Sequence, residues 1–191
     1  MSLVTQTKLL NYPGSILRVD PENPEPFNTI PTDHVNGSSI DVRLGKHFWV
    51  EDNQRTRPVR LARKESIGMT KVTLDWGQEF MLQPGQFILA ETVEVFYMPA
   101  ELSAEFRLKS SIARSALDQS LAVWCDPWWH GSNLTLELRN CAKYHPLVLE
   151  VGMKLGQMVF FEGEPVPHES GYAMRGQYNN DKGATPSKGV R

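Results

Sequence analysis

Hydrophobic and polar residues alternate with a period of two along much of this chain. The clearest case is residues 133–139, where three leucines are predicted on one face and three polar side chains on the other: Leu134, Leu136 and Leu138 against Thr135, Glu137 and Arg139. Such alternation is typical of a strand with one buried and one exposed face. Short apolar runs of this kind recur along the chain, and Pro-Gly and Gly-rich turn signals separate them. The pattern predicts an all-β sandwich or barrel.

We expect ten strands, at the strings LRV, SIDVRL, KHFWVE, KVTLDW, EFML, QFILAETVEVFYM, LSAEFRL, LTLELR, LVLEV and QMVFFE. Two short segments have a helical pattern instead, around residues 5–11 and 110–117. With 191 residues, the chain has the length of a single domain that can bury a hydrophobic core.

Two regions depart from the strand pattern. Residues 51–70 are polar and rich in arginine, and we interpret them as a solvated loop between strands, with a weaker alternative role in binding phosphate or a partner. Residues 162–191 are rich in Gly, Pro and polar residues and lack a sustained apolar period. We therefore expect a β-domain over residues 1–161 and a mobile C-terminal segment over residues 162–191, either a lid that orders on a ligand or a disordered terminus.

Charge and cysteine content narrow the functional classes. The net charge of −2 does not favour a nucleic acid polymer as partner, whereas a free nucleotide requires only a local cluster of cations. Cys125 and Cys141 lack the spacing of a disulfide framework or a zinc ribbon, and we expect reduced, buried thiols. No secretory leader or membrane-spanning stretch is evident, so the expected location is cytoplasmic and no membrane partner is expected.

The richest candidate chemistry lies in residues 108–140. Ser110 and Ser111 open a predicted helical turn, whose free backbone N–H groups suit an anionic ligand. Arg114 follows one turn later on the same side. Glu137 projects from the polar face of its strand, and partial burial there would raise its pKa towards the range of a general base. The alternative is that Glu137 pairs with Arg139 or Lys143 on a solvated face.

Six strings occur in the order and spacing of a known family: SSIDVRLG, LQPGQFILAETVE, KSSIAR, AVWCDPWWHG, LTLELRN and GMKLGQMVF. Together they resemble the dCTP deaminase family of the dUTPase-like superfamily, over residues 14–188. The resemblance implies a distorted jelly roll, the β-clip, and a homotrimer in which neighbouring subunits share each active site.

The resemblance also implies a role for each matching residue. Glu137 corresponds to the general base that activates water, and Ser110 and Arg114 to the residues that orient the water and the carboxylate. The backbone around Ala122 would read the pyrimidine edge, and Asp126 would bind the deoxyribose 3′-hydroxyl.

The phosphate side of the implied site has its own matches. Lys109 and Ser111 fall at substrate-binding positions beside Ser110. The string GQYNNDKGATPSK resembles the family's C-terminal lid, in which Tyr178 would cover the nucleotide and the segment beginning at Lys182 would close over the phosphates.

Several residues differ from the family pattern: Lys109 replaces an arginine, Trp128 a glycine, Gln177 a lysine and Asp181 a glutamine. Lysine keeps the charge but lacks the bidentate geometry of arginine. An acidic side chain beside a polyphosphate is unfavourable unless a metal or Lys182 offsets its charge. These differences leave the preferred phosphate chain open.

The metal content follows from the motifs. The chain lacks the H-x-E and P-C-x-x-C signature of zinc deaminases, and His130 has no cysteine at a spacing that would complete a zinc site. We therefore expect deamination without zinc, with Mg²⁺ accompanying the triphosphate.

Three tryptophans, Trp124, Trp128 and Trp129, are expected to fill the core or a subunit interface, with stacking on a base as the alternative.

The leading functional hypothesis is hydrolytic deamination of dCTP to dUTP and ammonia. The alternatives are a bifunctional enzyme that carries dCTP through to dUMP and pyrophosphate, a dUTPase, and a non-catalytic nucleotide sensor. Inhibition by dTTP is a further possibility that the sequence leaves open.

Overall fold

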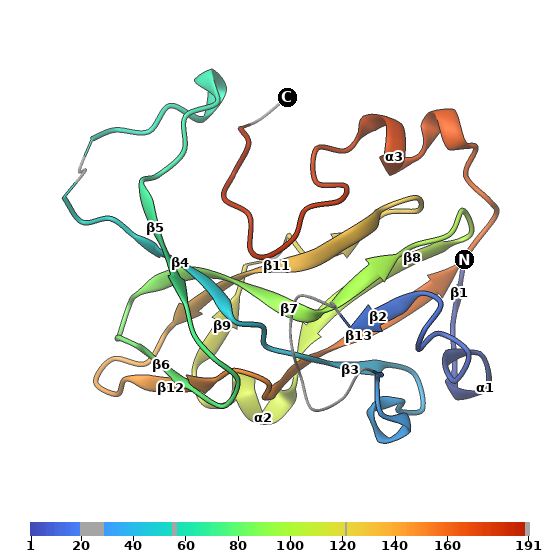
Figure 1. Cartoon of the computed structure of the whole chain (residues 1–191), viewed down its shortest axis with the longest axis horizontal. Helices are drawn as coiled ribbons and strands as arrows, with labels where there is room; N and C mark the ends of the chain where they lie inside the picture. The colour runs from blue at the N-terminus through green and yellow to red at the C-terminus, as the bar shows by residue number, and fades with distance from the viewer. Residues whose placement is uncertain (20–28, 55–56, 121, 190–191) are drawn as a thin grey trace.

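The computed structural model describes residues 1–19, 29–54, 57–120 and 122–189. Two larger sheets and one small sheet form most of it (Figure 1). The all-β expectation is therefore confirmed.

The first sheet has the strand order β1-β13-β8-β10, with β3 also paired to β13. Its strands are β1 (Ser2–Leu3), β3 (Ile40–Arg43), β8 (Leu102–Leu108), β10 (Trp124–Cys125) and β13 (Lys154–Glu162). Neighbouring strands of this sheet pair antiparallel, and the pairs join residues that are distant in sequence.

The second sheet has the order β5-β4-β7-β11-β9, with β2 paired to β7. Its strands are β2 (Leu17–Val19), β4 (His47–Glu51), β5 (Met69–Thr73), β7 (Phe87–Tyr97), β9 (Leu117–Gln119) and β11 (His130–Asn140). A small sheet joins β6 (Glu79–Leu82) to β12 (Leu147–Glu150).

The described helices are short. They are α1 (Gln6–Leu9), α2 (Ser110–Ala113) and α3 (Tyr172–Arg175), with 3-10 turns at Thr32–His34, Leu61–Arg63 and His168–Ser170. The helix predicted around residues 110–117 ends earlier than expected, because Ala116 adopts a positive φ of 66° and Leu117 pairs with β11 as part of β9. Tertiary pairing therefore overrides the local helical pattern.

One buried cluster takes side chains from both large sheets, including Phe106 and Phe160 from the first and Phe48 and Phe96 from the second. The three leucines of β11 belong to it, with Leu136 and Leu138 fully buried. Burial of such side chains contributes roughly 1.5–3 kcal/mol each. The leucine face predicted for residues 133–139 is thus confirmed as the inner face of the strand, and Thr135 and Glu137 are left on the other.

The tail after β13 returns across the second sheet and runs along β11 (Figure 1). Backbone bonds join Asn180 N–H to the His130 carbonyl and Asn133 N–H to the Asp181 carbonyl. A break in the β11–β7 register between Asn133 and Thr135 accompanies this contact. The tail therefore lies over the polar face of the strand that carries Glu137.

Candidate active site

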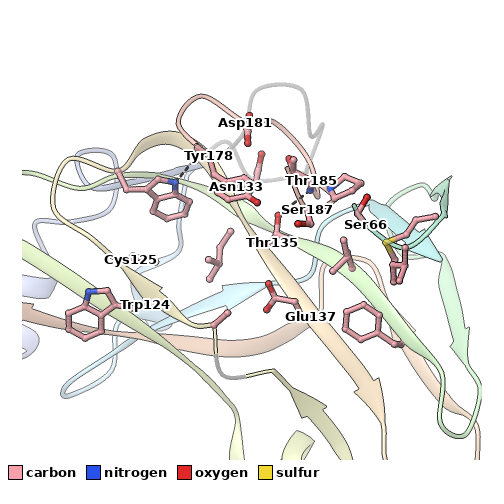
Figure 2. Close-up of a pocket in the computed structure, with 18 of the residues that line it drawn as sticks. Ser66, Trp124, Cys125, Asn133, Thr135, Glu137, Tyr178, Asp181, Thr185 and Ser187 are labelled. Carbon is pink, nitrogen blue, oxygen red and sulfur yellow. Dashed lines mark hydrogen bonds between the residues drawn. The ribbon is translucent and has the colours of Figure 1, made fainter. Parts of the chain in front are cut away.

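A cavity of about 690 Å³ lies between β11, the loop before β5 and the C-terminal tail (Figure 2). Phe87 and Leu89 of β7 form part of its wall, and Thr135 and Glu137 of β11 project into it. Thr185, Pro186 and Ser187 of the tail close another side. Its volume falls in the range of pockets that hold small molecules and nucleotides.

Glu137 is the central ionisable group of this cavity. It lies opposite Leu89 in the antiparallel β11–β7 pair, which holds its backbone in place. Burial raises the pKa of Glu137 from 4.5 to about 7, because an ionised carboxylate loses hydration in the protein. A carboxylate with this pKa accepts and returns a proton near neutral pH.

The side-chain partner of Glu137 is Gln119, whose Nε2 donates to Oε2 at 2.7 Å. The alternative of an ion pair with Arg139 or Lys143 does not occur among the described residues. Arg139 lies exposed further along β11. Glu137 therefore lies partly buried with a neutral partner rather than in an exposed ion pair.

The charges around the cavity are unbalanced. Its described lining contains four carboxylates, Glu65, Asp126, Glu137 and Asp181, and no lysine or arginine. Lys188, which lies outside the lining, balances the charge of Asp181, since its Nζ lies 2.6 Å from Oδ2. An anionic phosphate chain would be repelled by this arrangement unless further cations approach.

The cationic and hydroxyl residues predicted to complete the site lie elsewhere on the chain. Ser110 and Ser111 are in α2 and Arg114 follows directly, all three exposed to solvent, and none of them lines the cavity. Figure 1 shows α2 at the opposite end of the molecule from the tail. One chain therefore does not bring Ser110 and Arg114 to its own Glu137.

Two expectations for this segment change. With four residues, α2 is too short to offer the aligned N–H groups and dipole of a longer helix to an anion. Lys109 instead forms an ion pair with the buried Asp41, at 2.8 Å from Nζ to Oδ1. Lys109 is therefore engaged with protein rather than presented freely to a ligand.

The residues predicted for the pyrimidine and sugar do lie at the cavity. Ala122 and Asp126 are both in its lining, beside Trp124 and Cys125. Asp126 accepts a hydrogen bond at Oδ1 from Trp124 Nε1 at 3.1 Å, which orients its carboxylate. The structure thus groups Glu137, Ala122 and Asp126 in one place.

The predicted lid residue Tyr178 also lines the cavity. Its backbone carbonyl accepts hydrogen bonds from Trp129 Nε1 and Ser132 Oγ, and its hydroxyl accepts one from Lys188 N–H at 3.1 Å. Lys182 does not belong to the cavity lining, although it makes contacts of its own. Of the two lid residues singled out, only Tyr178 faces the cavity.

Side chains of the second sheet hold the tail in position through hydrogen bonds. Asn133 Oδ1 accepts a hydrogen bond from Gly183 N–H at 3.0 Å, and Thr135 Oγ1 accepts one from Thr185 N–H at 3.1 Å. Trp49 Nε1 donates to the Ala184 carbonyl at 2.7 Å. Gly183 has a φ of +78° and passes close to Glu91 and His47, where a side chain would meet both.

Several cavity residues were not predicted. The segment 51–70, expected to be a solvated loop, contributes Val59, Leu61, Ile67 and Met69 to the wall. Its scattered apolar residues carry no period, so the sequence offered little indication of this role. Thr135 was identifiable in principle, since it lies two residues before Glu137 on the same polar face.

Two of the three tryptophans line the cavity and also stack on phenylalanines. Trp129 is buried and stacks on Phe96, and Trp124 is 48% exposed and stacks on Phe161. Trp128 has a φ of +69°, and its indole N–H donates to the Val166 carbonyl. Trp128, which stands where the family pattern has glycine, therefore anchors the first part of the tail.

The two cysteines of the chain differ in exposure. Both cysteines are free; Cys125 is buried as expected, but Cys141 is exposed, which contradicts the expectation for that residue. Among the described residues, no group of three or more His, Cys, Asp or Glu side chains is arranged to hold a metal ion. No helix in the described part of the chain is long and apolar enough to cross a membrane.

Comparison with known proteins identifies close similarity over most of the chain. Residues 18–163 match the family model described as dCTP deaminase-like. A protein of Nocardia farcinica named dCTP deaminase, dUMP-forming, is 38% identical over 81% of this chain and 78% of its own length. A protein of Acidothermus cellulolyticus with the same name is 40% identical over 81% of each chain.

A solved structure shares the fold. The crystal structure of 2′-deoxycytidine 5′-triphosphate deaminase from Agrobacterium tumefaciens superposes with a TM-score of 0.63 at 20% identity. The match covers 88% of this chain and half of the Agrobacterium chain. This match shows a shared β-fold and so confirms the fold expected from the family resemblance.

Proposed function

We propose that this chain, which belongs to the dCTP deaminase-like family, removes the C4 amino group of dCTP by hydrolysis and carries the product through to dUMP. The observation that carries the proposal is Glu137, a partly buried carboxylate with a pKa of about 7 on the wall of a nucleotide-sized cavity. The relatives named dCTP deaminase, dUMP-forming, support the choice of dUMP as the final product. This choice replaces dUTP, the product expected from sequence, with the bifunctional alternative.

Glu137 acts as general base and then as general acid. Its carboxylate takes a proton from water, and the hydroxide adds to C4 of the cytosine. The resulting acid gives this proton to N3. The carboxylate then takes the proton of the new C4 hydroxyl and passes it to the departing amino group, so that the C4–N bond breaks and dCTP and water become dUTP and ammonia. A pKa of about 7 suits both halves of this cycle, since the group must accept and release protons at the same pH.

Each active site is shared between copies of the chain. The cavity supplies carboxylates, the pyrimidine-facing segment and the tail, whereas exposed Ser110, Ser111 and Arg114 lie at the far end of the same chain. A second copy that docks its α2 segment beside the cavity would bring Arg114 to a site that otherwise repels phosphate. This complementarity supports a site shared between copies, in which Ser110 and Arg114 of one copy orient the water and Glu137 of its neighbour. The family resemblance implies that the assembly is a homotrimer.

The nucleotide is held by the groups around Glu137. The backbone near Ala122 reads the pyrimidine edge, Asp126 binds the 3′-hydroxyl, and Tyr178 covers the nucleotide as part of the lid. Ser111 of the neighbouring copy contributes to the phosphate side, as does Lys109 once it exchanges Asp41 for phosphate. Lys182 reaches the phosphates by a shift of the tail, since it lies outside the cavity lining.

Mg²⁺ enters as part of the substrate, bound to the triphosphate, and the deamination step uses no zinc. The product dUTP then loses pyrophosphate by attack of a second water, giving dUMP. The sensor alternative lacks support from the site, because nucleotide binding alone does not require a carboxylate with a pKa of about 7.

The test is incubation of the purified protein with dCTP and Mg²⁺, followed by chromatographic measurement of ammonia, dUTP, dUMP and pyrophosphate. Equal amounts of ammonia, dUMP and pyrophosphate support the proposal, and accumulation of dUTP would limit the enzyme to deamination. Protein treated with a zinc chelator before addition of Mg²⁺ should keep full activity. Addition of dTTP to the same assay determines whether it inhibits.

A protein that consumes neither dCTP nor dUTP would contradict the proposed activity. Binding of dCTP without turnover would then favour the sensor alternative. Turnover of dUTP but not dCTP would identify a dUTPase.

A further inference from the structure

Gln119 closes a small hydrogen-bonded ring around Glu137. Its Nε2 donates one hydrogen to Glu137 Oε2 at 2.7 Å and the other to the Ser120 carbonyl at 3.2 Å. Ser120 N–H in turn donates to the Glu137 carbonyl at 3.0 Å. The side chain and the backbone of Glu137 are therefore both tied to the end of β9.

We propose that Gln119 is a positioning residue that holds one oxygen of the Glu137 carboxylate and leaves the other to exchange protons with substrate. Oε2 is occupied by the amide, while Oε1 has no side-chain partner among the described residues. This assignment rests on the proposed function, because it gives Glu137 the role of general base. It adds a residue that neither the sequence motifs nor the family resemblance singled out.

The orientation of the Gln119 amide is determined by its two acceptors. Rotation by 180° would place Oε1 against the Ser120 carbonyl and against an ionised Glu137, which are both acceptors. In the observed orientation both hydrogens of Nε2 are used. Gln119 therefore favours the ionised form of Glu137 over the protonated form.

Folding alone gives little reason for an amide at this position. Gln119 is 8% exposed, and its Oε1 is buried without a hydrogen-bond partner in the described structure. A buried acceptor without a partner is destabilising, so a leucine of similar volume would remove that cost. The benefit of glutamine lies in its contact with Glu137.

Two opposing effects determine the protonation of Glu137. Burial is the larger and raises its pKa, whereas hydrogen bonds from its own backbone and from Gln119 lower it. Loss of the Gln119 donor would therefore raise the pKa of Glu137 further. Since a general base must be ionised, the acid side of the pH–rate profile would move to higher pH.

Other charged groups near Glu137 leave this assignment intact. Glu65, Asp126 and Asp181 face the same cavity from the loop, the segment after β10 and the tail. On the adjacent strands, Glu91 of β7 pairs with His47, while Asp118 of β9 and Arg139 of β11 are exposed. None of these groups forms a hydrogen bond or ion pair with Glu137 in the described structure. Arg114 of a neighbouring copy would act equally on the parent and on a Gln119 variant.

The experiment compares the parent with Gln119→Leu and Gln119→Glu, and uses Asp118→Asn as a matched control on the same strand. We expect Gln119→Leu to move the acid limb of kcat for dCTP upwards by about one pH unit, with most activity regained at high pH. Below the parent midpoint this is a roughly tenfold loss. Gln119→Glu should shift the limb further, because two adjacent carboxyl groups resist simultaneous ionisation. Asp118→Asn should leave the profile unchanged.

A second measurement follows Glu137 without relying on turnover. Infrared or carbon NMR titration of the carboxyl groups, with Glu137→Gln to assign the signal, gives its midpoint in the parent and in Gln119→Leu. An unchanged midpoint, or an equal loss of kcat at all pH values, would overturn the role of Gln119. If the parent fails to turn over dCTP while the carboxyl midpoint still shifts, the proposed function fails but the pairing of Gln119 with Glu137 stands.

Discussion

The two ends of this molecule differ in charge and in completeness. At one end, β11 and the tail enclose a cavity lined by four carboxylates and by no described lysine or arginine. At the other, Ser110 and Ser111 of α2 and the following Arg114 are exposed to solvent and do not line this cavity. Each end carries groups that the other lacks, and under the proposed function assembly of several copies would bring them together.

The cavity end loses its chemistry if Glu137 is changed. Glu137→Gln should reduce ammonia release from dCTP by about 10³-fold or more, because a general base contributes roughly 10²–10⁴ and the amide cannot take a proton. Binding of dCTP, measured by calorimetry, should persist, since the amide has a similar size. Deamination near the parent rate would contradict the assignment of Glu137.

Mixed assemblies test the division between the two ends. Arg114→Ala alone should reduce activity by about 10²-fold, because the charge that orients the water and the carboxylate is lost. Refolding Arg114→Ala together with Glu137→Gln should restore activity, since some sites then receive Glu137 from one chain and Arg114 from another. Random mixing at equal amounts leaves about one site in four intact.

Two controls accompany this mixture. The same mixture prepared without unfolding, in which chains have not exchanged, should stay inactive. No recovery after verified exchange would place Arg114 and Glu137 of the same chain together and remove the contrast between the two ends.

The tail makes the cavity end sensitive to single hydrogen bonds. Trp49→Phe removes the donor to the Ala184 carbonyl and should weaken tail closure about fivefold, the effect of a bond that contributes roughly 1 kcal/mol. Faster proteolysis within residues 176–189 and a higher KM for dCTP are the expected readouts. Trp76→Phe is the matched control, because Trp76 packs against Gly152 rather than against the tail. Equal effects of the two substitutions would argue against a role of the Trp49–Ala184 bond in holding the tail.

The smallest expected effect concerns stability against pH. Glu137 has a pKa of about 7 in the folded chain and 4.5 when free. Between these two pH values the folded chain keeps the proton, whereas the unfolded chain loses it. Its contribution to stability is complete below about pH 4.5 and falls as pH rises to about 7. Glu137→Gln should therefore be more stable than the parent at pH 8, by about 1–2 kcal/mol after allowance for partial exposure, with the difference vanishing below about pH 4.5. Thermal unfolding of both proteins across this range, with Asp118→Asn in parallel, measures the effect.

The alternating pattern of residues 133–139 was sufficient to predict β11, its buried leucine face and the position of Glu137 on the opposite, polar face. Alternation records burial directly, since successive side chains of a strand point to opposite sides. The short strands β1, β9 and β10 were not predicted. Two residues, as in β1 and β10, carry no period, and β9 begins inside the segment 110–117 that has a helical pattern. Their pairing depends on neighbours more than ten residues away in sequence.

Within the site, the sequence identified Glu137, Ala122, Asp126 and Tyr178, and the structure places all four at one cavity. It also identified Ser110 and Arg114, but it did not indicate that they lie at the other end of the same chain. Gln119 and the apolar residues of the loop before β5 had no recognisable signal.

The sequence by itself determined the all-β class, the family and the identity of the candidate base, because these follow from local periodicity and from ordered motifs. Only the tertiary structure decided which groups meet. The bond from Gln119 to Glu137 and the bonds from the tail to Asn133 and Thr135 join residues far apart in sequence. The same packing puts the acidic cavity and Arg114 at opposite ends of the molecule (Figure 1). Such contacts arise from the packing of whole sheets, which brings together side chains that no local pattern relates.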